Sequence, residues 1–347
     1  MIKVLIVEDS AVVQQFLVYV LSSDPDIRVI GTTNNGEEAL EFLKQEKPDV
    51  ITMDIHMPRM NGFETTRKVM ATHPTPIVIV SGSVQPEEVS TTFRAIEAGA
   101  LAVVPRPSGL GHPDYERTAR TLIQTVKAMS EVKVVRRWRQ TPSTVWASPV
   151  PDVKKGSDAA EIVAIGASTG GPVALQALLS RLGSDFAAPI VIVQHMTAGF
   201  MDGFVQWLAQ SSSLPVHVAS HGQQAQSGHV FLAPDGFQMR MDSGRRIFLS
   251  NDEPENGLRP SVSYLFRSVA DTFGKNAVGV LLTGMGKDGA EELKLMRDRG
   301  AVTIAQDKDS SVVHGMPGEA IRLGAACHVL PPDRIAAALA LLGGRKG

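Results

Sequence analysis

The sequence predicts an α/β protein made of two doubly wound domains, and three observations support this. Short apolar runs rich in β-branched residues alternate with longer helix-like stretches along most of the chain, which is typical of parallel strands buried between helices. The alternation stops once, between residues 126 and 158, where proline, glycine, serine and basic residues accumulate, as they do in linkers. With 347 residues, the chain is long enough for a separate core on each side of that linker.

The composition indicates a globular protein, with 43% hydrophobic and 20% charged residues, and excludes a disordered chain. A formal net charge of −2 gives no support for nucleic acid or an anionic membrane as the main partner. The single cysteine, Cys327, suits a reducing compartment. The opening MIKVLIVEDS is unlike a signal peptide, and no apolar run reaches the roughly 18 residues of a membrane span. We therefore expect a cytoplasmic protein without membrane insertion and without a nucleic-acid partner.

The first half contains the strand signals of one parallel sheet. Apolar runs occupy residues 4–7, 27–31, 50–53, 77–80 and 101–104. Each run is followed by a polar turn and a helix-like segment, so we expect parallel strands connected by helices. On this basis we place the first domain at residues 1–125, the linker at 126–158 and the second domain at 159–347.

Acidic, hydroxyl and basic side chains follow these strands, at the sheet edge where α/β proteins bind ligands. They are Glu8, Asp9, Asp54, Ser81 and Arg106. Carboxylates brought together repel one another unless a cation lies among them, and an all-oxygen cluster favours Mg²⁺. With a metal, a hydroxyl and a fixed positive charge nearby, Asp54 can accept a phosphoryl group as an acyl phosphate. The alternative is helix capping, which accounts for Asp9 but not for the whole set.

The segments VLIVEDS, VITMDIHMPRMNG, IVIVSGS and EAGALAVVPRP resemble the response-regulator receiver domain, across about the first 120 residues. The resemblance implies a five-stranded, flavodoxin-like fold that is phosphorylated on Asp54. It also implies that Glu8 and Asp9 help to hold Mg²⁺ and that Ser81 contacts the phosphoryl group.

Two positions depart from the receiver pattern. Arg106 stands where receivers carry a lysine before proline, which keeps the charge but changes its shape and reach. Val103 stands where receivers carry an aromatic residue that takes part in switching. We therefore expect the phosphorylation chemistry to be retained and the transmission of its signal to be altered.

The alternation resumes in the second half. Apolar runs occupy residues 162–165, 190–193, 230–232, 278–282 and 301–305, which again predicts a mostly parallel sheet. The first run ends in IVAIGASTGGP, where Ser168 lies in a Gly-rich turn before a helix starting at Pro172. Three interpretations compete: a dinucleotide loop, a Gly-x-Ser-x-Gly nucleophile turn, and a purely structural turn. The next strand ends in Gln194 and His195, without the acid that a dinucleotide site requires.

His195 and Asp288 favour the nucleophile. A serine hydroxyl needs a base, and the base needs an orienting carboxylate. His195 ends the strand that follows Ser168 along the chain, and a later strand leads into TGMGKDG, which carries Asp288. If these strands are neighbours, the three side chains lie at one edge of one sheet. The backbone N–H groups of Thr169 and Met285 are then candidates for an oxyanion hole.

Other residues remain as alternatives. His314 in SVVHGMPGEA is a second choice of base, and Asp235 and Asp307 are rival carboxylates in turn-rich sequence, where capping is the commoner role. Further histidines lack a metal-ligand pattern with nearby carboxylates and suit surface or core roles: His217, His221 and His229. The chain order Ser–His–Asp also differs from the Ser–Asp–His order of α/β-hydrolases.

Six segments resemble the catalytic domain of the chemotaxis protein-glutamate methylesterases, in order across residues 159–343: VAIGASTGGP, VIVQHM, FLAPDG, RPSVSYLFRSVA, LLTGMGKDGA and VVHGMPGEA. The resemblance implies a serine hydrolase that acts on γ-glutamyl methyl esters of chemoreceptors, releases methanol, and deamidates particular receptor glutamines. The triad then falls on Ser168, His195 and Asp288, the oxyanion turn on Met285, and the ester reaction needs no cofactor.

Thr197 and Ser263 depart from the family pattern, and we expect them to alter the rim of the cleft. The implied partners are chemoreceptors as substrate and the chemotaxis histidine kinase as phosphodonor. The implied regulation is docking of the receiver over the cleft of a monomeric enzyme. Two other functions stay open. A receiver with a merely binding output domain predicts an unusable triad position, and a receiver with a DNA-binding output needs a basic stripe. The dense basic run KVVRRWR lies in the linker instead.

Overall fold

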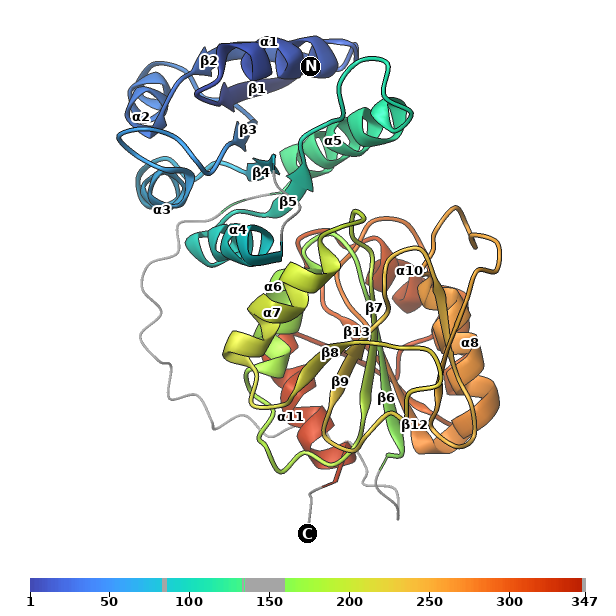
Figure 1. The fold of residues 1–347 in the computed structure, drawn as a ribbon. Coiled ribbons are helices and arrows are strands. Elements are labelled where there is room, and N and C mark those ends of the chain that lie inside the picture. Colours follow the sequence, from blue (N-terminus) through green and yellow to red (C-terminus); the bar gives the residue numbers. More distant parts are fainter. Residues whose placement is uncertain (83–85, 133, 135–159, 345–347) are drawn as a thin grey trace. The chain divides into compact units, whose positions relative to one another are not determined.

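The computed structural model describes residues 1–82, 86–132, 134 and 160–344. The chain forms two compact units, Met1–Thr144 and Val145–Gly347 (Figure 1). The basic run KVVRRWR and most of the predicted linker lie outside the described residues.

The first unit is a parallel sheet of five strands in the order β2-β1-β3-β4-β5, with helices on both faces (Figure 1). Every neighbouring pair is parallel, so the predicted doubly wound fold is confirmed. The strands are β1 (Ile2–Val7), β2 (Ile27–Thr33), β3 (Val50–Met53), β4 (Ile77–Ser81) and β5 (Ala102–Pro105). One face carries α1 (Ala11–Ser22) and α5 (Tyr115–Ser130), and the other carries α2 (Gly36–Gln45), α3 (Gly62–Thr72) and α4 (Pro86–Ala98).

Two helices of this unit, α2 and α3, begin where an asparagine side chain satisfies free backbone N–H groups. The Asn35 side chain accepts hydrogen bonds from the N–H groups of Glu37 and Glu38, and Asn61 accepts one from Glu64. Such caps stabilise a helix because its first N–H groups have no partner inside it. The strand β3 between these helices is buried along its whole length, as expected for a central parallel strand.

The second unit contains a seven-stranded sheet in the order β14-β13-β12-β6-β7-β9-β8. All of its pairings are parallel, and a separate pair, β10-β11, is antiparallel. The predicted runs correspond to β6 (Ile162–Ala167), β7 (Ile190–Gln194), β9 (Val230–Leu232), β12 (Ala277–Leu281) and β13 (Val302–Gln306). The sequence prediction missed β8 (Val216–Val218), β10 (Gln238–Met241), β11 (Ile247–Ser250) and β14 (His328–Leu330).

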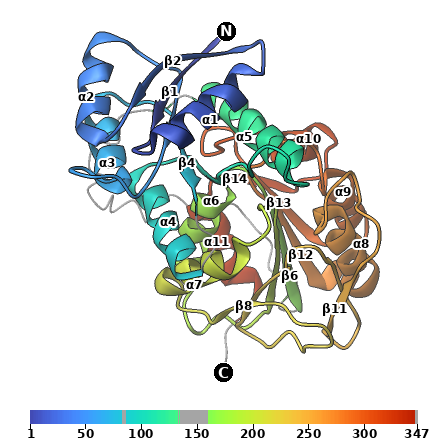
Figure 2. The ribbon, with the colours of Figure 1, turned by 45° about the horizontal axis from the view of Figure 1, so that its top comes forward.

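Helices cover both faces of this sheet (Figures 1 and 2). One face carries α6 (Gly171–Leu179), α7 (Met201–Ser211) and α11 (Pro332–Leu342). The other carries α8 (Val262–Phe273), α9 (Ala290–Asp298) and α10 (Met316–Arg322). Among the described residues, none of the helices combines the length and the apolar character needed to cross a membrane.

Candidate active site

Ser168 follows the buried strand β6 at the carboxyl edge of the sheet. Its N–H donates to the Thr283 carbonyl at 3.0 Å, and its own carbonyl accepts from the Gly171 N–H at 2.8 Å. The chain turns sharply here because Gly170 has φ of +80°, a conformation that side chains rarely adopt. Ser168 is consequently half-buried at the beginning of a helix, with its backbone fixed on both sides.

His195 follows β7, the parallel neighbour of β6, one residue after the register pair Ala167 and Gln194. Its Nε2 lies 2.9 Å from Oδ2 of Asp288. Because Nε2 faces Asp288, Nδ1 is the other nitrogen of the ring. Within the described residues, no hydrogen bond joins the Ser168 hydroxyl to this ring. Bonds between a nucleophile and its base commonly tighten only when substrate binds.

Asp288 lies in the turn after β12, which pairs with β6 on the side opposite β7. The three residues therefore follow three adjacent strands, β12, β6 and β7. The Asp288 carboxylate is 4% exposed. Burial by itself would raise its pKa, but hydrogen bonds from His195 and from the Val262 N–H outweigh that cost, and the pKa lies below its usual value. Asp288 is thus an ionised carboxylate in contact with a histidine.

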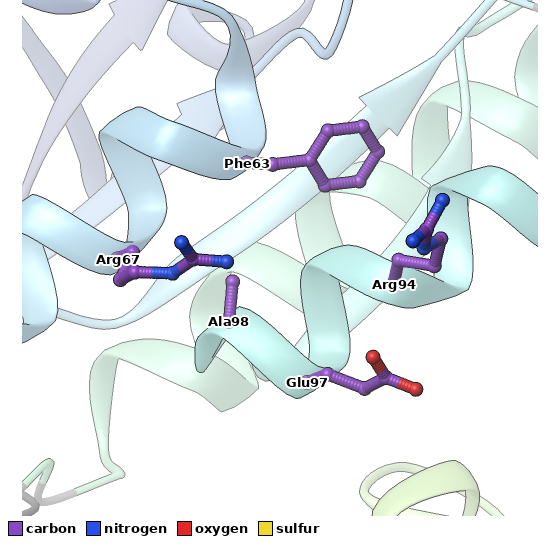
Figure 3. A pocket seen from close by; sticks show the side chains of 5 residues that line it. All are labelled: Phe63, Arg67, Arg94, Glu97 and Ala98. Atoms are coloured by element: carbon purple, nitrogen blue, oxygen red, sulfur yellow. The ribbon is translucent and has the colours of Figure 1, made fainter. Parts of the chain in front are cut away.

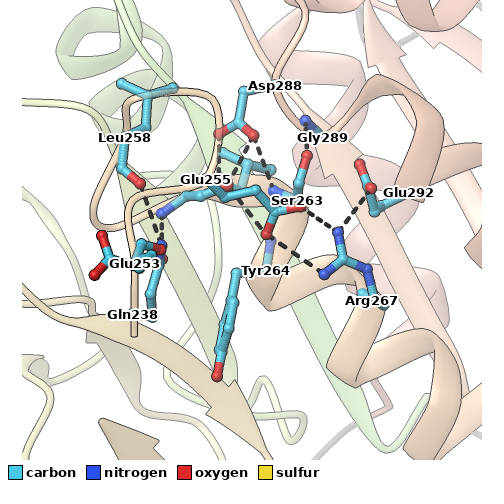
Figure 4. Close-up of polar contacts among 12 residues, drawn as sticks. Gln238, Glu253, Glu255, Leu258, Ser263, Tyr264, Arg267, Asp288, Gly289 and Glu292 are labelled. Carbon is cyan, nitrogen blue, oxygen red and sulfur yellow. Dashed lines mark hydrogen bonds and ion pairs between the residues drawn. The ribbon is translucent and has the colours of Figure 1, made fainter. Parts of the chain in front are cut away.

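Ser263 supports the turn that carries Asp288 and does not lie at the rim of the cleft. The expectation about its place was wrong, because this serine is only 3% exposed. Its N–H donates to Asp288 Oδ1 at 3.2 Å, and its hydroxyl accepts from the Gly289 N–H at 2.9 Å. Figure 4 shows Ser263 between Asp288 and Gly289 at the start of α8.

The turn after β12 packs directly against Ser168. A Cβ placed on Gly284 would lie 2.7 Å from the Ser168 Cβ, so only glycine fits between the two chain segments. Within the described residues, the N–H groups of Thr169 and Met285 have no hydrogen-bond partner. Two unpaired backbone donors next to Ser168 suit an oxyanion hole.

Gln194 contributes to the site, and the sequence analysis did not assign it a role. Its side-chain N–H₂ donates to the carbonyl of Ser168 at 2.9 Å and to that of His195 at 2.7 Å. The side chain is buried and connects the segments that carry Ser168 and His195. The sequence does contain a signal for this role: an amide side chain ends an apolar strand. A buried amide requires hydrogen-bond partners.

The alternative base and carboxylates have other contacts. His314 lies beside Gly284 through its backbone, but its Nδ1 lies 3.2 Å from the Ser311 hydroxyl. Asp235 accepts from the Gly199 N–H at 2.8 Å, and Asp307 accepts from the Ser310 N–H at 3.0 Å. Asp307 thus caps its own turn, whereas Asp235 connects its turn to the loop before α7.

The other three histidines of the second unit that the sequence analysis considered have partners other than Asp288. His217 Nε2 lies 3.0 Å from His229 Nδ1, and the two rings are stacked. His221 Nδ1 lies 2.9 Å from the Leu249 carbonyl.

The first unit has its own cluster of charged side chains. One carboxylate oxygen from each of Glu8, Asp9 and Asp54 lies within 4.8 Å of the others. Burial and the charge of Asp54 raise the pKa of Glu8 to about 7, and burial also raises that of Asp54. Buried carboxylates that repel one another can bind a divalent cation, because its positive charge offsets their repulsion. Arg106 lies 3.2 Å from Glu8 and 4.0 Å from Asp54.

Ser81 ends β4 beside this cluster and is buried, and Val103, on β5, is half-buried. A cavity of about 330 Å³ opens elsewhere in the unit, between α3 and α4 (Figure 3). Its lining shares no residue with the acidic cluster: Phe63, Arg67, Arg94, Glu97 and Ala98.

Two known protein families match this chain, one in each unit. The model of the CheB methylesterase family matches residues 163–339, and that of the response regulator receiver domain matches residues 4–112. The chain belongs to the CheB methylesterase family. The matched regions contain the Ser168, His195 and Asp288 cluster and the acidic cluster, respectively.

Relatives of the CheB methylesterase family match along the whole chain. A protein-glutamate methylesterase/protein-glutamine glutaminase of Nitrosospira multiformis is 60% identical, covering 100% of this chain and 98% of the relative. One from Geobacter metallireducens is 56% identical, with 100% of both covered. The crystal structure of the Thermotoga maritima CheB methylesterase catalytic domain superposes with a TM-score of 0.51 and 36% identity, covering 53% of this chain and 98% of that chain.

Proposed function

We propose that this chain is a phosphorylation-regulated serine hydrolase that removes methyl groups from glutamate methyl esters of methyl-accepting chemoreceptors. The same site deamidates particular receptor glutamines. The activity follows from the full-length relatives named protein-glutamate methylesterase/protein-glutamine glutaminase. The observation that carries the mechanism is the 2.9 Å contact between His195 and the buried Asp288, one strand away from Ser168.

The first half of the reaction acylates Ser168. His195 takes the hydroxyl proton while Oγ attacks the carbonyl carbon of the ester, and Asp288 stabilises the resulting imidazolium. The carbonyl oxygen becomes negatively charged and receives hydrogen bonds from the N–H groups of Thr169 and Met285. When the tetrahedral intermediate collapses, the bond to the methoxy group breaks, and methanol leaves with the proton from His195.

The second half releases the glutamate side chain. Water gives a proton to His195 and attacks the acyl carbon, and the bond to Oγ breaks as Ser168 recovers its proton. With a glutamine substrate the leaving group of the first half is ammonia. Both substrates therefore end as a glutamate carboxylate.

The receiver unit regulates this activity through Asp54. The Asp54 carboxylate attacks phosphorus to form an acyl phosphate, while the phosphodonor leaves with the electrons of the broken bond. Glu8, Asp9 and Asp54 would hold Mg²⁺, which offsets the charge of the incoming phosphoryl group. Ser81 and Arg106 contact the phosphoryl oxygens. The chemotaxis histidine kinase is the phosphodonor, and the enzyme acts as a monomer in the cytoplasm.

The test is methanol release from receptor membranes carrying labelled methyl esters. The full chain is expected to release methanol, and faster after treatment with an acyl-phosphate donor and Mg²⁺. Ser168→Ala is expected to reduce the rate to background, because the nucleophilic oxygen is lost, and Asp54→Asn to remove the response to the donor. Ser180→Ala serves as a matched control, since this exposed serine ends the helix that Ser168 precedes.

A Ser168→Ala protein that is folded and retains near-normal methanol release contradicts the assigned nucleophile. A wild-type chain that binds receptor but releases no methanol contradicts the enzymatic function and favours a binding role for the output domain.

A further inference from the structure

The Asp288 carboxylate is surrounded by the beginning of helix α8. Oδ1 accepts hydrogen bonds from the Ser261 hydroxyl at 2.8 Å and from the Ser263 N–H at 3.2 Å. Oδ2 accepts from the Val262 N–H at 2.6 Å and lies 2.9 Å from His195 Nε2. Both oxygens are therefore engaged, and the carboxylate cannot rotate toward or away from His195 without breaking one of these bonds.

Two of these donors are backbone groups of the first turn of α8. The N–H groups at the start of a helix have no partner inside it and carry partial positive charge. In α8 they point at a carboxylate from another element, so Asp288 acts as an anion bound at a helix amino terminus. This accounts for a buried carboxylate that stays ionised.

Ser261 is the side-chain component of this arrangement. The Ser263 side chain also hydrogen-bonds to Asp288, but Ser261 makes the 2.8 Å bond from its hydroxyl to Oδ1. It is fully buried, and its own N–H donates to Gln238 Oε1 at 2.9 Å. Its hydroxyl also accepts the Tyr264 N–H as the cap of α8. The hydroxyl proton is consequently directed at the carboxylate.

The position of Ser261 is set by an element outside the main sheet. Gln238 lies on β10 and is completely buried. Its Nε2 donates to the carbonyls of Glu253 and Leu258 at 3.3 and 3.2 Å, so one amide holds both the loop before α8 and the cap itself. Figure 4 shows Gln238 reaching Leu258 next to the Asp288 turn.

We propose that Ser261 is a positioning residue of the triad, whose hydroxyl fixes Asp288 and takes up part of its negative charge. A hydrogen bond donated to a carboxylate reduces the charge that its other partners experience. Ser261 therefore sets how strongly Asp288 holds a protonated His195. The inference rests on the proposed roles of Ser168, His195 and Asp288.

The test is the pH dependence of methanol release by full-length Ser261→Ala. Without the hydroxyl, more charge remains on the carboxylate, and protonated His195 is better stabilised. Because only a neutral imidazole accepts the serine proton, the acid limb of the kcat profile is expected to move to higher pH by about half a unit. The maximal kcat is expected to fall about tenfold, with little change in KM, because the looser carboxylate no longer orients the ring.

Two further variants separate this role from a general effect on folding. Ser261→Thr keeps the hydroxyl and is expected to restore the wild-type pH profile. Ser268→Ala removes a hydroxyl from the same helix that donates to the Leu265 carbonyl and accepts from the Met241 N–H. That variant loses comparable hydrogen bonds but is expected to keep the wild-type profile.

An activity-independent measurement distinguishes failure of this inference from failure of the proposed function. NMR titration of the His195 ring in the resting full chain is expected to show protonation at higher pH in Ser261→Ala than in the wild type. An unchanged or lower midpoint overturns the inference, whatever the esterase activity. If the midpoint rises but the wild type releases no methanol, the positioning role of Ser261 toward Asp288 is supported and the proposed reaction is contradicted.

Discussion

Gln194 shows how a single buried amide organises this site. Its donors bind the carbonyls of Ser168 and His195, the two residues whose side chains must meet. Its Oε1 lies where a Cβ on Gly171 would come within 2.0 Å, so the amide also packs tightly against the helix that Ser168 precedes. The separation between the proposed nucleophile and the proposed base therefore depends on a side chain that contacts neither the Ser168 hydroxyl nor the His195 ring.

Gln194→Leu is expected to lower kcat by about tenfold to a hundredfold, because a small misplacement of reacting groups is costly and two part-buried carbonyls lose their donor. Gln206→Leu, a change at an exposed position of α7, is the control and is expected to be neutral. Steady-state kinetics on methylated receptor, together with circular dichroism to verify folding, measure the effect. Equal kcat values for the two variants would refute the positioning role.

Asp288 also links the site to acid stability. Its pKa in the folded protein lies below the usual 3.8, so the ionised carboxylate stabilises the fold at pH values above about 4. That contribution is lost as the pH falls through the folded-state pKa, where the carboxylate takes up a proton.

Asp288→Asn is therefore expected to unfold at lower urea concentration than the wild type at pH 7, and the difference is expected to shrink below pH 4. Urea titrations at a series of pH values measure it. A difference between the two proteins that stays constant from pH 7 to pH 3 would show that Asp288 does not contribute through its charge.

At Gly284 in the catalytic domain, neighbouring elements approach one another so closely that only glycine fits. The turn after β12 touches Ser168 at Gly284, where an added Cβ would also lie 2.3 Å from the Met316 sulfur. The same turn bonds to the segment before α10 through Gly284 and Val313. The turn after β12, the segment of Ser168 and the start of α10 are thus in contact with one another. A shift of one of them displaces the other two.

Gly284→Ala is expected to reduce methanol release about a hundredfold, since the new methyl group must displace Ser168 or Met316. Gly244→Ala provides the control, because a Cβ there meets its nearest neighbour, Asp242 Oδ1, at 3.4 Å, an ordinary contact. Initial rates and melting temperatures of both variants are compared with the wild type. Near-normal activity of a folded Gly284→Ala protein would show that the turn adapts.

At the scale of the whole molecule, two units with different chemistry share one chain. The acidic cluster lies in the first unit and the Ser168, His195 and Asp288 cluster in the second. In the acidic cluster, where the proposed regulation starts, Arg106 stands at the position of the lysine expected in receivers. Its guanidinium lies within 4.0 Å of both Glu8 and Asp54, so one group contacts both carboxylates.

Arg106→Lys is expected to lower the ratio of methanol release with and without acyl phosphate, because the compact ammonium of lysine differs in shape and reach from the guanidinium whose Nη2 lies near both Glu8 and Asp54. The ratio for the full chain in Mg²⁺ is the measurement, with Asp54→Asn as the unresponsive reference. Should Arg106→Lys respond as strongly as the wild type, the shape of the arginine is immaterial to the switch.

The sequence alone predicted two α/β units, their main strands and the residues at the strand ends. This was possible because strands buried on both faces are continuous apolar runs, and because a polar residue directly after such a run lies at the carboxyl edge of the sheet. Ser168, His195 and Asp54 stand out for that reason. The sequence analysis missed four short strands, β8, β10, β11 and β14. Each of them contains a polar residue and is not buried along its whole length, so none forms a continuous apolar run.

Only the tertiary structure decided which strand ends meet. β12 lies beside β6, although more than a hundred residues separate them along the chain, and this pairing brings Asp288 to His195. The contacts of Gln194, Ser261 and Ser263 likewise depend on neighbours distant in sequence, so no local pattern indicates them. The identity of the reacting groups follows from residue type and local strand pattern, whereas their orientation follows from long-range packing and hydrogen bonds.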